Sequence, residues 1–304
     1  MHLLKKRQKS QLLHGLQLLD QRMTLSEEDK RYLYNLEKGL EGEEIFDAYV
    51  KKYLYGEVII LNDLLLTVKG STIQLDTLII TTEGVRIYEV KNYKGNYQML
   101  SGRLLTLSGQ EISSPLSQVN RSLIKLRQLF IEWEMNETVE GIVAFVEPSF
   151  YLYNADPADL FVFPSQIALH FATIHKNMTR LSKSQHFLAE KLIEANQTEA
   201  FYEKKLPVHD YQTLKKGLTC LSCGSFDLTL SQRSCQCNDC FIKVSVDETL
   251  MNNIGDLRVL FPEKKLTTSL VYDWCDRAVV FKKIRRILQK NFTVKGKATG
   301  TYYD

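Results

Sequence analysis

The stretch Ile73–Lys91, IQLDTLIITTEGVRIYEVK, decides the fold of this chain. It contains two largely apolar runs, Leu75–Thr81 and Val85–Val90, on either side of a Thr-Glu-Gly turn candidate at 82–84. Glycine supplies the positive φ that tight hairpin loops need. The sequence therefore predicts a β-hairpin with Glu83 and Gly84 as its two-residue loop.

The register of this hairpin places charged side chains together. Thr82 would pair with Val85, which puts Asp76 opposite Lys91 and Glu89 on the diagonal, roughly 7–8 Å away. Side chains alternate between the faces of a strand, so Glu89 and Lys91 point to the same side. Charged residues at strand ends more often form a solvated rim, but Asp76 stands inside an apolar strand. Two carboxylates and an ammonium on one face outline a metal and phosphate site.

Length and composition predict an ordinary soluble protein. The 304 residues suffice for two or three compact units, with 44% hydrophobic and 25% charged residues. A net charge of +3 is too small to indicate nucleic-acid binding by itself, and no apolar run approaches the roughly 20 residues of a membrane span. The basic segment at 5–7 is followed by an interrupted apolar stretch, unlike a secretory signal. We expect a cytoplasmic protein without a membrane partner.

Helices are expected before the hairpin. Leucines at helical spacing predict a helix over 3–23, and a second begins at 25–29 with a capping serine and three acids. Gly39 and Gly42 should end it, and a third helix should then run to about Leu54. Glu43 or Glu44 opens this third helix. An acid there more often compensates the helix dipole, but it could also project toward the carboxylates of the hairpin.

Strands and helices alternate around the hairpin. Short β runs are expected at 58–61 and 63–68, further strands at 97–100, 103–107 and 141–146, and helices at 164–172 and 185–195. Ser114 and Pro115 begin another helix, with Gln118 in its first turn. The fold class is therefore α/β, a mixed β-sheet flanked by helices.

Four sequence elements together resemble the nuclease-related domain (NERD) family. They span about Lys38–Phe130, with leucine and serine replacing the isoleucine and asparagine of the second and fourth family elements. The four elements are KGLEGE at 38–43, QLD at 74–76, EVKN at 89–92 followed by Gly95, and SPLSQ at 114–118. The resemblance implies a branch of the PD-(D/E)xK nuclease superfamily, whose spacing of Asp, twelve residues and Glu-x-Lys is present without the first proline.

Such a fold implies a divalent-metal nuclease. Phosphodiester hydrolysis needs a hard cation that polarises phosphate and lowers the pKa of a bound water, so Mg²⁺ or Mn²⁺ is the expected cofactor. Lys91 would orient the attacking water or stabilise the phosphate charge. Glu43 would reach the metal through water, and Gln118 would position water or phosphate. The expected metal ligands are Asp76, Glu89 and the carbonyl of Val90.

Four of the six cysteines form two Cys-x₂-Cys knuckles separated by 13 residues. Four thiolates at this spacing resemble a zinc ribbon and predict a closed, structural Zn²⁺ site, in which Gly224 lets the first knuckle turn tightly. Cys235 is an alternative ligand to Cys237, and a redox role is the alternative for the knuckles. The expected zinc ligands are Cys220, Cys223, Cys237 and Cys240.

The C-terminal segment is basic. A helix capped at 267–269 should run to about Cys275, and a turn at 276–277 should lead into a second helix. Seven Lys or Arg and no acid lie between Phe281 and Gly300. The pair resembles a helix-turn-helix that lays its second helix on DNA, although a charge run is often just a solvated face. The expected nucleic-acid contacts are Lys282, Lys283, Arg285 and Arg286.

These features divide the chain into four predicted parts. Residues 1–37 would form N-terminal helices, 38–205 the NERD nuclease-like domain, 206–250 the zinc ribbon and 251–304 the helix-turn-helix-like module. The expected function is metal-dependent hydrolysis of DNA. The alternative is a non-catalytic nucleic-acid-binding or signalling adaptor on a decayed nuclease fold. Motifs of other hydrolases, such as Gly-x-Ser-x-Gly and the Walker loop, are absent from the sequence.

Overall fold

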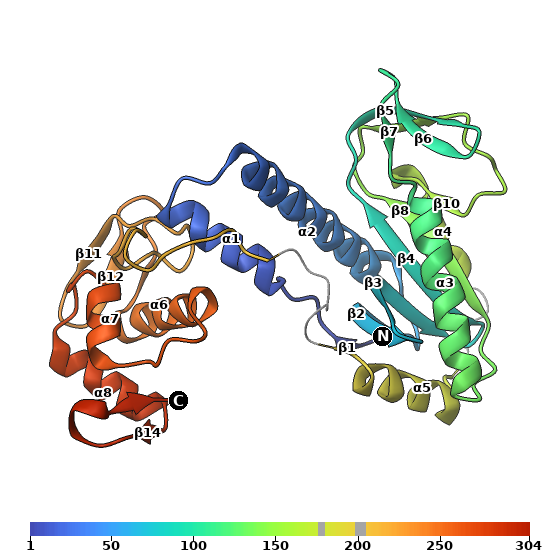
Figure 1. Ribbon diagram of the computed structural model, residues 1–304. Helices are drawn as coiled ribbons and strands as arrows, with labels where there is room; N and C mark the ends of the chain where they lie inside the picture. The colour runs from blue at the N-terminus through green and yellow to red at the C-terminus, as the bar shows by residue number, and fades with distance from the viewer. Residues whose placement is uncertain (176–179, 198–204) are drawn as a thin grey trace. The chain divides into compact units, whose positions relative to one another are not determined.

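The computed structural model describes residues 1–175, 180–197 and 205–304 (Figure 1). Its contacts divide the chain into two compact units, one formed by residues 1–9 and 35–203 and the other by 10–34 and 204–304. Helix α2 (Glu27–Tyr53) passes from the second unit into the first at residue 35. The four-part division made from the sequence stays a prediction. In the described residues no helix combines the length and apolar character needed to cross a bilayer.

The first unit is built on a mixed six-stranded sheet of order β1-β2-β3-β4-β8-β10. The central strands β2, β3 and β4 are antiparallel neighbours, whereas β1, β8 and β10 each pair in parallel. The bounds are β1 His2–Lys5, β2 Ile59–Val68, β3 Ser71–Thr81, β4 Gly84–Lys91, β8 Val139–Phe145 and β10 Phe161–Val162.

Helices cover both faces of this sheet. Helices α3 (Pro115–Glu132) and α5 (Lys183–Glu194) bury their apolar sides in one hydrophobic cluster with β2, β3 and β4 (Figure 1). Helices α2 and α4 (Ile167–His175) form the cluster on the opposite face, and the 3₁₀ turn Pro164–Gln166 leads into α4. The predicted α/β class, a mixed sheet flanked by helices, is confirmed.

A smaller sheet of order β7-β6-β5-β9 adjoins the end of β4 in the chain. Its strands are β5 Gly95–Leu100, β6 Arg103–Thr106, β7 Glu111–Ile112 and β9 Phe150–Tyr153. Phe145 at the end of β8 stacks on Phe150 with ring centroids 4.0 Å apart, and Tyr93 contacts both rings. This aromatic cluster joins the two sheets just beyond the last residues of β4.

The hairpin forms, but its predicted register is wrong by two residues. Thr81 pairs with Gly84, so the loop is Thr82-Glu83, and the ladder ends at the pair Thr77–Tyr88, one position before Asp76 and Glu89. Gly84 is the first residue of the strand and not part of the loop. The position requires glycine because a Cβ there would be 2.1 Å from the Thr138 hydroxyl of the neighbouring segment. A shift of two residues moves no side chain of the paired stretch Thr77–Thr81 to the other face.

Helix α2 runs without a break through Gly39 and Gly42, contrary to the prediction of two helices. A glycine inside a helix costs only about 1 kcal/mol, and the buried residues Phe46, Val50 and Leu54 offset that cost. Gly42 also has a steric role, because a Cβ there would lie 2.5 Å from the Cβ of Asn92. The side-chain amide of Asn92 donates to the Lys38 carbonyl at 3.0 Å. The first and third family elements are therefore in direct contact.

The predicted helix over 3–23 is in fact a strand followed by a helix. Strand β1 pairs with β2, and helix α1 (Gln11–Arg22) begins after Ser10, whose hydroxyl accepts from the Leu13 amide at 3.1 Å. The leucine spacing located the helix correctly from Gln11 onward. The edge strand was missed because four residues that pair only with a distant strand carry little local signal.

The second unit packs α1 against the C-terminal part of the chain. Helix α6 was not predicted, although Val246, Leu250, Ile254 and Leu257 have helical spacing and are all buried. The helix at 268–274 and the basic helix after the turn are present as predicted. The elements are β11 Leu228–Leu230, β12 Ser234–Cys237, β13 Lys243–Ser245, α6 Val246–Leu260, α7 Thr268–Trp274, α8 Phe281–Asn291, β14 Val294–Lys295, a 3₁₀ turn Ala298–Gly300 and β15 Tyr302–Tyr303.

Arg22 lies at the centre of this unit. Its guanidinium is 4.0 Å from the centroid of the Trp274 ring and donates to the Lys215 carbonyl at 2.8 Å. Asn253 on α6 accepts from the Thr219 amide at 2.9 Å, and its own carbonyl accepts from the Trp274 indole at 3.0 Å. These contacts hold α1, α6, α7 and the segment before the first cysteine knuckle together.

Stability at acidic pH should depend on His170 of α4. Its Nε2 lies 2.9 Å from the Tyr88 hydroxyl, and burial, followed by the charge of Arg86, lowers its pKa from 6.5 to about 4. Between these pH values the unfolded chain binds the proton that the folded chain rejects, so stability falls with falling pH. The shift corresponds to roughly 3 kcal/mol.

We expect His170→Gln to remove this part of the pH dependence, measured by urea unfolding at steps from pH 7 to pH 4. His186→Gln, on the exposed side of α5, is the matched control and should keep the wild-type slope. Identical slopes for wild type and His170→Gln would contradict the assignment.

Candidate functional site

A break in strand alternation marks the site. Leu61 and Leu64 are three residues apart yet belong to the same hydrophobic cluster, and so do the residues opposite them, Leu78 and Leu75. A regular strand would place residues three apart on opposite faces. The break falls on both strands between these leucines, at 62–63 and 76–77, where Asp63 adopts a φ of 52°. Because of this break, Asp63 and Asp76 lie in the middle of two apolar strands while their side chains stay out of the hydrophobic core.

Asp76 is half-buried at this break. Its Oδ2 accepts from the Val90 amide at 2.8 Å, beyond the last β3–β4 backbone pair. Burial raises its pKa well above the usual range, and the charges of Glu89 and Glu43 raise it further, against the opposing effect of Lys91. The ammonium of Lys91 lies 2.7 Å from Oε1 of Glu89. The structure therefore brings Asp76, Glu89 and Lys91 together, as the hairpin prediction required.

Glu43 is held by Arg7, a residue that the sequence analysis did not select. The guanidinium of Arg7 lies 2.7 Å from Glu43, 3.0 Å from Asp47 and 2.6 Å from Asp63. It also donates to the Asp76 carbonyl at 3.1 Å. The Arg7 side chain is only 6% exposed. Arg7 is thus a buried cation in the middle of the acidic cluster.

The charged groups of this cluster shift one another's pKa values. Burial opposes the charge of Arg7, but its hydrogen bond with Asp47 and the charge of Glu43 prevail and raise its pKa. For the carboxyl of Glu43, burial acts in the opposite direction and raises the pKa to about 7, although Arg7 acts to lower it. No local pattern marks Arg7 as special, because its partners lie 36 or more residues away in the sequence. Its only signal is its place in a basic stretch before the first helix.

Gln118 lies in the first turn of α3, at the same end of the sheet as Glu89. Val119 packs on Gly141 of β8, which pairs with Ile87, and Arg127 donates to the carbonyl at the start of β8. Helix α3 therefore runs antiparallel to β8 and begins near the last residues of β4. Oε1 of Gln118 is buried and has no hydrogen-bond partner among the described residues.

This arrangement fits a hard cation in part. Asp76 and Glu89 supply carboxylate oxygens, and the unpartnered Gln118 oxygen is a further acceptor at the same end of the sheet. Within the described ranges, however, the cysteines form the only group of three or more potential ligands whose atoms lie within 4.8 Å of one another. Glu43, which is hydrogen-bonded to Arg7, therefore does not form a compact three-ligand group with Asp76 and Glu89. The ligand role of the Val90 carbonyl stays a prediction.

The four predicted cysteines converge. Sγ of Cys220 lies 3.6 Å from that of Cys240, and Sγ of Cys223 lies 3.5 Å from that of Cys237. Tetrahedral zinc with Zn–S bonds of about 2.3 Å separates its sulfurs by about 3.8 Å, so the quartet fits a zinc ribbon. Cys235 lies outside the group and pairs with Val244 in the β12–β13 ladder.

Glycine and backbone amides shape the knuckles. Gly224 adopts a φ of 73°, and a Cβ there would lie 2.3 Å from the Gln21 side chain of α1. The first knuckle therefore turns tightly, as predicted, and also packs closely on α1. Hydrogen bonds from the amides of Cys240 and Asp239 lower the pKa of Cys237 to about 7, although burial acts in the other direction.

The basic helix α8 keeps its cations outside the core. Ile284, Ile287 and Leu288 form its buried side, whereas Lys282 and Arg285 are exposed. Lys283 and Arg286 are within 3.2 and 3.5 Å of Asp247 on α6. Helices α7 and α8 have the predicted order, but their identity as a helix-turn-helix stays a prediction.

Comparison with known families identifies one part of the chain. Residues 38–146 match the family model described as nuclease-related domain. A search of curated proteins and a search of solved structures found no match. The matched range extends from the middle of α2 to the end of β8 and includes Glu43, Asp76, Glu89, Lys91 and Gln118. This match to the NERD family over residues 38–146 is the resemblance that the four sequence elements predicted.

Proposed function

We propose that the nuclease-related domain hydrolyses phosphodiester bonds of nucleic acid, with DNA as the substrate class. The observation that carries this proposal is the meeting of Asp76, in the middle of β3, with Glu89 and Lys91, at the end of β4. Two carboxylates beside an ammonium suit phosphate chemistry, because the carboxylates can bind a metal cation and the ammonium can bind the phosphate.

Each residue has a distinct role in this proposal. Asp76 and Glu89 hold Mg²⁺ or Mn²⁺, which when bound would polarise the phosphate and lower the pKa of a water. The Val90 amide orients the Asp76 carboxylate through the 2.8 Å hydrogen bond. Lys91 stabilises negative charge that develops on the phosphate, and Gln118 positions water through its unpartnered oxygen. Glu43 acts through Arg7 and through water.

In this proposal the second unit binds nucleic acid and contains no catalytic residue. We assign structural Zn²⁺ to the four cysteines, because all four positions are filled by protein and none is open to substrate. Lys282, Lys283, Arg285 and Arg286 would contact phosphates and so bind nucleic acid without sequence preference. Reduced thiols held by metal are typical of the cytoplasm, which we propose as the location.

A non-catalytic, nucleic-acid-binding adaptor is the second candidate. It is favoured by one observation, the ion pair of Arg7 with Glu43 at 2.7 Å. A fixed internal cation neutralises part of the acidic cluster, and this would suit a fold that has lost its metal. The two candidates differ in a single measurable property, the metal dependence of cleavage.

Cleavage should depend on Asp76. We expect the purified chain to cut nucleic acid with Mg²⁺ or Mn²⁺ and not with EDTA, and Asp76→Asn to lower the rate on the order of 100-fold or more, about 2.7 kcal/mol. Asparagine keeps the acceptor for the Val90 amide, so the fold should be retained. The assay compares single-stranded, duplex and branched DNA with RNA.

The matched control is Glu111→Gln, which removes an exposed carboxylate from the small sheet of the same unit. It should cleave at the wild-type rate. Equal metal-dependent rates for wild type and Asp76→Asn would refute the assignment of the site. Absence of cleavage on every substrate, with zinc-loaded and folded protein, would favour the adaptor.

A further inference from the structure

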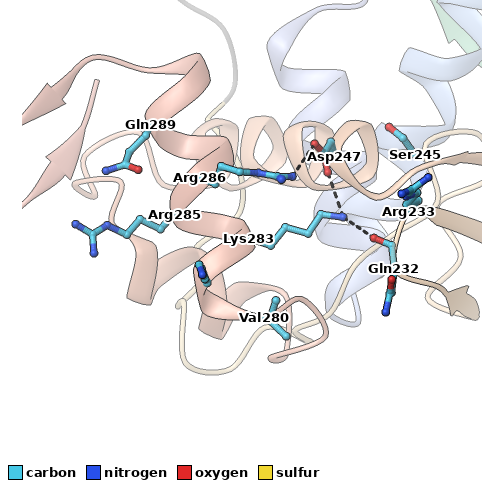
Figure 2. Close-up of a pocket in the computed structure, with 10 residues that line it drawn as sticks. Gln232, Arg233, Ser245, Asp247, Val280, Lys283, Arg285, Arg286 and Gln289 are labelled. Atoms are coloured by element: carbon cyan, nitrogen blue, oxygen red, sulfur yellow. Dashed lines mark hydrogen bonds and ion pairs between the residues drawn. The ribbon is translucent and has the colours of Figure 1, made fainter.

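A groove of about 870 Å³ lies within the second unit, between α8 and the zinc-ribbon hairpin (Figure 2). One wall is the polar side of α8. The other is formed by Gln232 and Arg233, in the turn between β11 and β12, and by Ser245 and Asp247 at the start of α6. The groove therefore joins the basic helix to the ribbon, two parts that the sequence analysis treated separately.

Positive charge dominates the lining. Among the described residues, five cationic side chains line the groove and a single acid, Asp247, faces them. On α8 the lining positions 282, 285, 286 and 289 are three or four residues apart and so form one stripe along the helix. The fifth cation, Arg233, comes from the opposite wall. The five cations are Arg233, Lys282, Lys283, Arg285 and Arg286.

The single acid restrains two of these cations. Lys283 lies 3.2 Å from Oδ1 of Asp247 and donates to the Gln232 carbonyl at 3.0 Å, and Arg286 lies 3.5 Å from Oδ2 of Asp247 (Figure 2). In the described part of the chain, Lys282 and Arg285 form no ion pair. Two of the cations are thus held by a carboxylate that a phosphate could replace.

We propose that this groove binds the phosphodiester backbone of a single nucleic-acid strand, with Asp247 competing for the phosphates. The inference rests on the proposed function only for the kind of ligand, since the groove belongs to the second unit and not to the nuclease-related domain. Proteins that hold single strands combine a cationic groove along the backbone with aromatic side chains on which bases stack, and this groove supplies the first of these two features.

The shape of the groove argues against the helix-turn-helix mode. A recognition helix must protrude to enter a major groove about 12 Å wide. Here the cationic stripe of α8 faces the ribbon turn across a cavity in the size range of small-ligand pockets. None of the described residues that line the groove is aromatic, so bases would not stack there. Binding should therefore be electrostatic, indifferent to sequence and strongly weakened by salt.

The role of Asp247 gives the decisive test. Asp247→Asn frees Lys283 and Arg286, and we expect it to bind a single strand about 3- to 10-fold more tightly. Arg233→Gln should weaken binding and reduce the slope of log K against log salt by about 0.7, the loss of one phosphate contact on a single strand. Lys297→Gln, an exposed cation of the same basic segment outside the groove, is the control and should change neither quantity.

Binding is measured by fluorescence anisotropy with a labelled 20-nucleotide oligothymidine and with a duplex of the same length. The protein is the zinc-loaded full chain carrying Asp76→Asn, without Mg²⁺, so that cleavage and binding are read separately. Thermal unfolding checks that each variant is folded. Unchanged or weaker binding by Asp247→Asn, or an Arg233→Gln slope equal to that of Lys297→Gln, would overturn the proposal. Tighter binding of the duplex would reject the single-strand assignment.

Discussion

Removal of zinc, or replacement of Cys237 by serine, is expected to unfold the ribbon and to destabilise the whole second unit by several kcal/mol, up to about 10 kcal/mol. The reason is the composition of the ribbon itself. Its three strands are three or four residues long, and its buried side chains are mainly the cysteines. Without a core of its own, the ribbon would depend on bound zinc for its fold.

The loss should spread beyond the ribbon because its contacts extend to both neighbouring helices. Gly224 packs against Gln21 of α1, and Thr219 is hydrogen-bonded to Asn253 of α6 at 2.9 Å. Asn253 in turn accepts from Arg22 and, through its carbonyl, from Trp274. An unfolded first knuckle would therefore expose the buried guanidinium of Arg22, which this set of hydrogen bonds holds.

Metal analysis and thermal unfolding check this prediction together. Wild type should contain one zinc per chain, and Cys237→Ser should lose it along with the unfolding transition of the second unit. Cys235→Ala is the matched control, because Cys235 is a buried thiol in the same strand but outside the quartet. Loss of zinc from Cys235→Ala, or its full retention in Cys237→Ser, would show that the ligand set is wrong.

Local sequence patterns predicted the features whose geometry is set by residues close together in the sequence. Alternation placed Asp76, Glu89 and Lys91 on one side of a hairpin, and a register error of two residues did not change this, because a strand repeats every two residues. The Cys-x₂-Cys spacing located the cysteine quartet because each knuckle is a local turn.

Features fixed by distant contacts could not be predicted in this way. Gly84 looked like a loop residue, but its position is set by Thr138. Gly42 looked like a helix end, but it admits the close approach of Asn92. Cys235 and Cys237 share one side of β12, so the choice between them depends on which position along the strand lies next to the first knuckle. In each case the deciding partner is absent from the local sequence window.

Arg7 is the extreme case of such a distant contact, and its removal should have the second largest effect. In Arg7→Met the carboxylates of Glu43, Asp47 and Asp63 lose their shared cation. Breaking a buried ion pair leaves uncompensated charge and typically costs about 3–5 kcal/mol. We expect a loss of this size in urea unfolding of the first unit at pH 8. Lys6→Met, at the exposed neighbouring position, should be nearly neutral.

The variant also separates a structural from a functional Arg7. Glu43→Gln added to Arg7→Met should restore part of the stability, because it removes one of the opposed charges. Lower pH should do the same, since burial has already raised the pKa of Glu43 to about 7 and loss of Arg7 raises it further. If Mg²⁺ stabilises Arg7→Met more than wild type, the arginine occupies a place that a divalent cation can fill. An equal effect of Mg²⁺ on both proteins would mean that Arg7 only holds the N-terminal strand against the sheet.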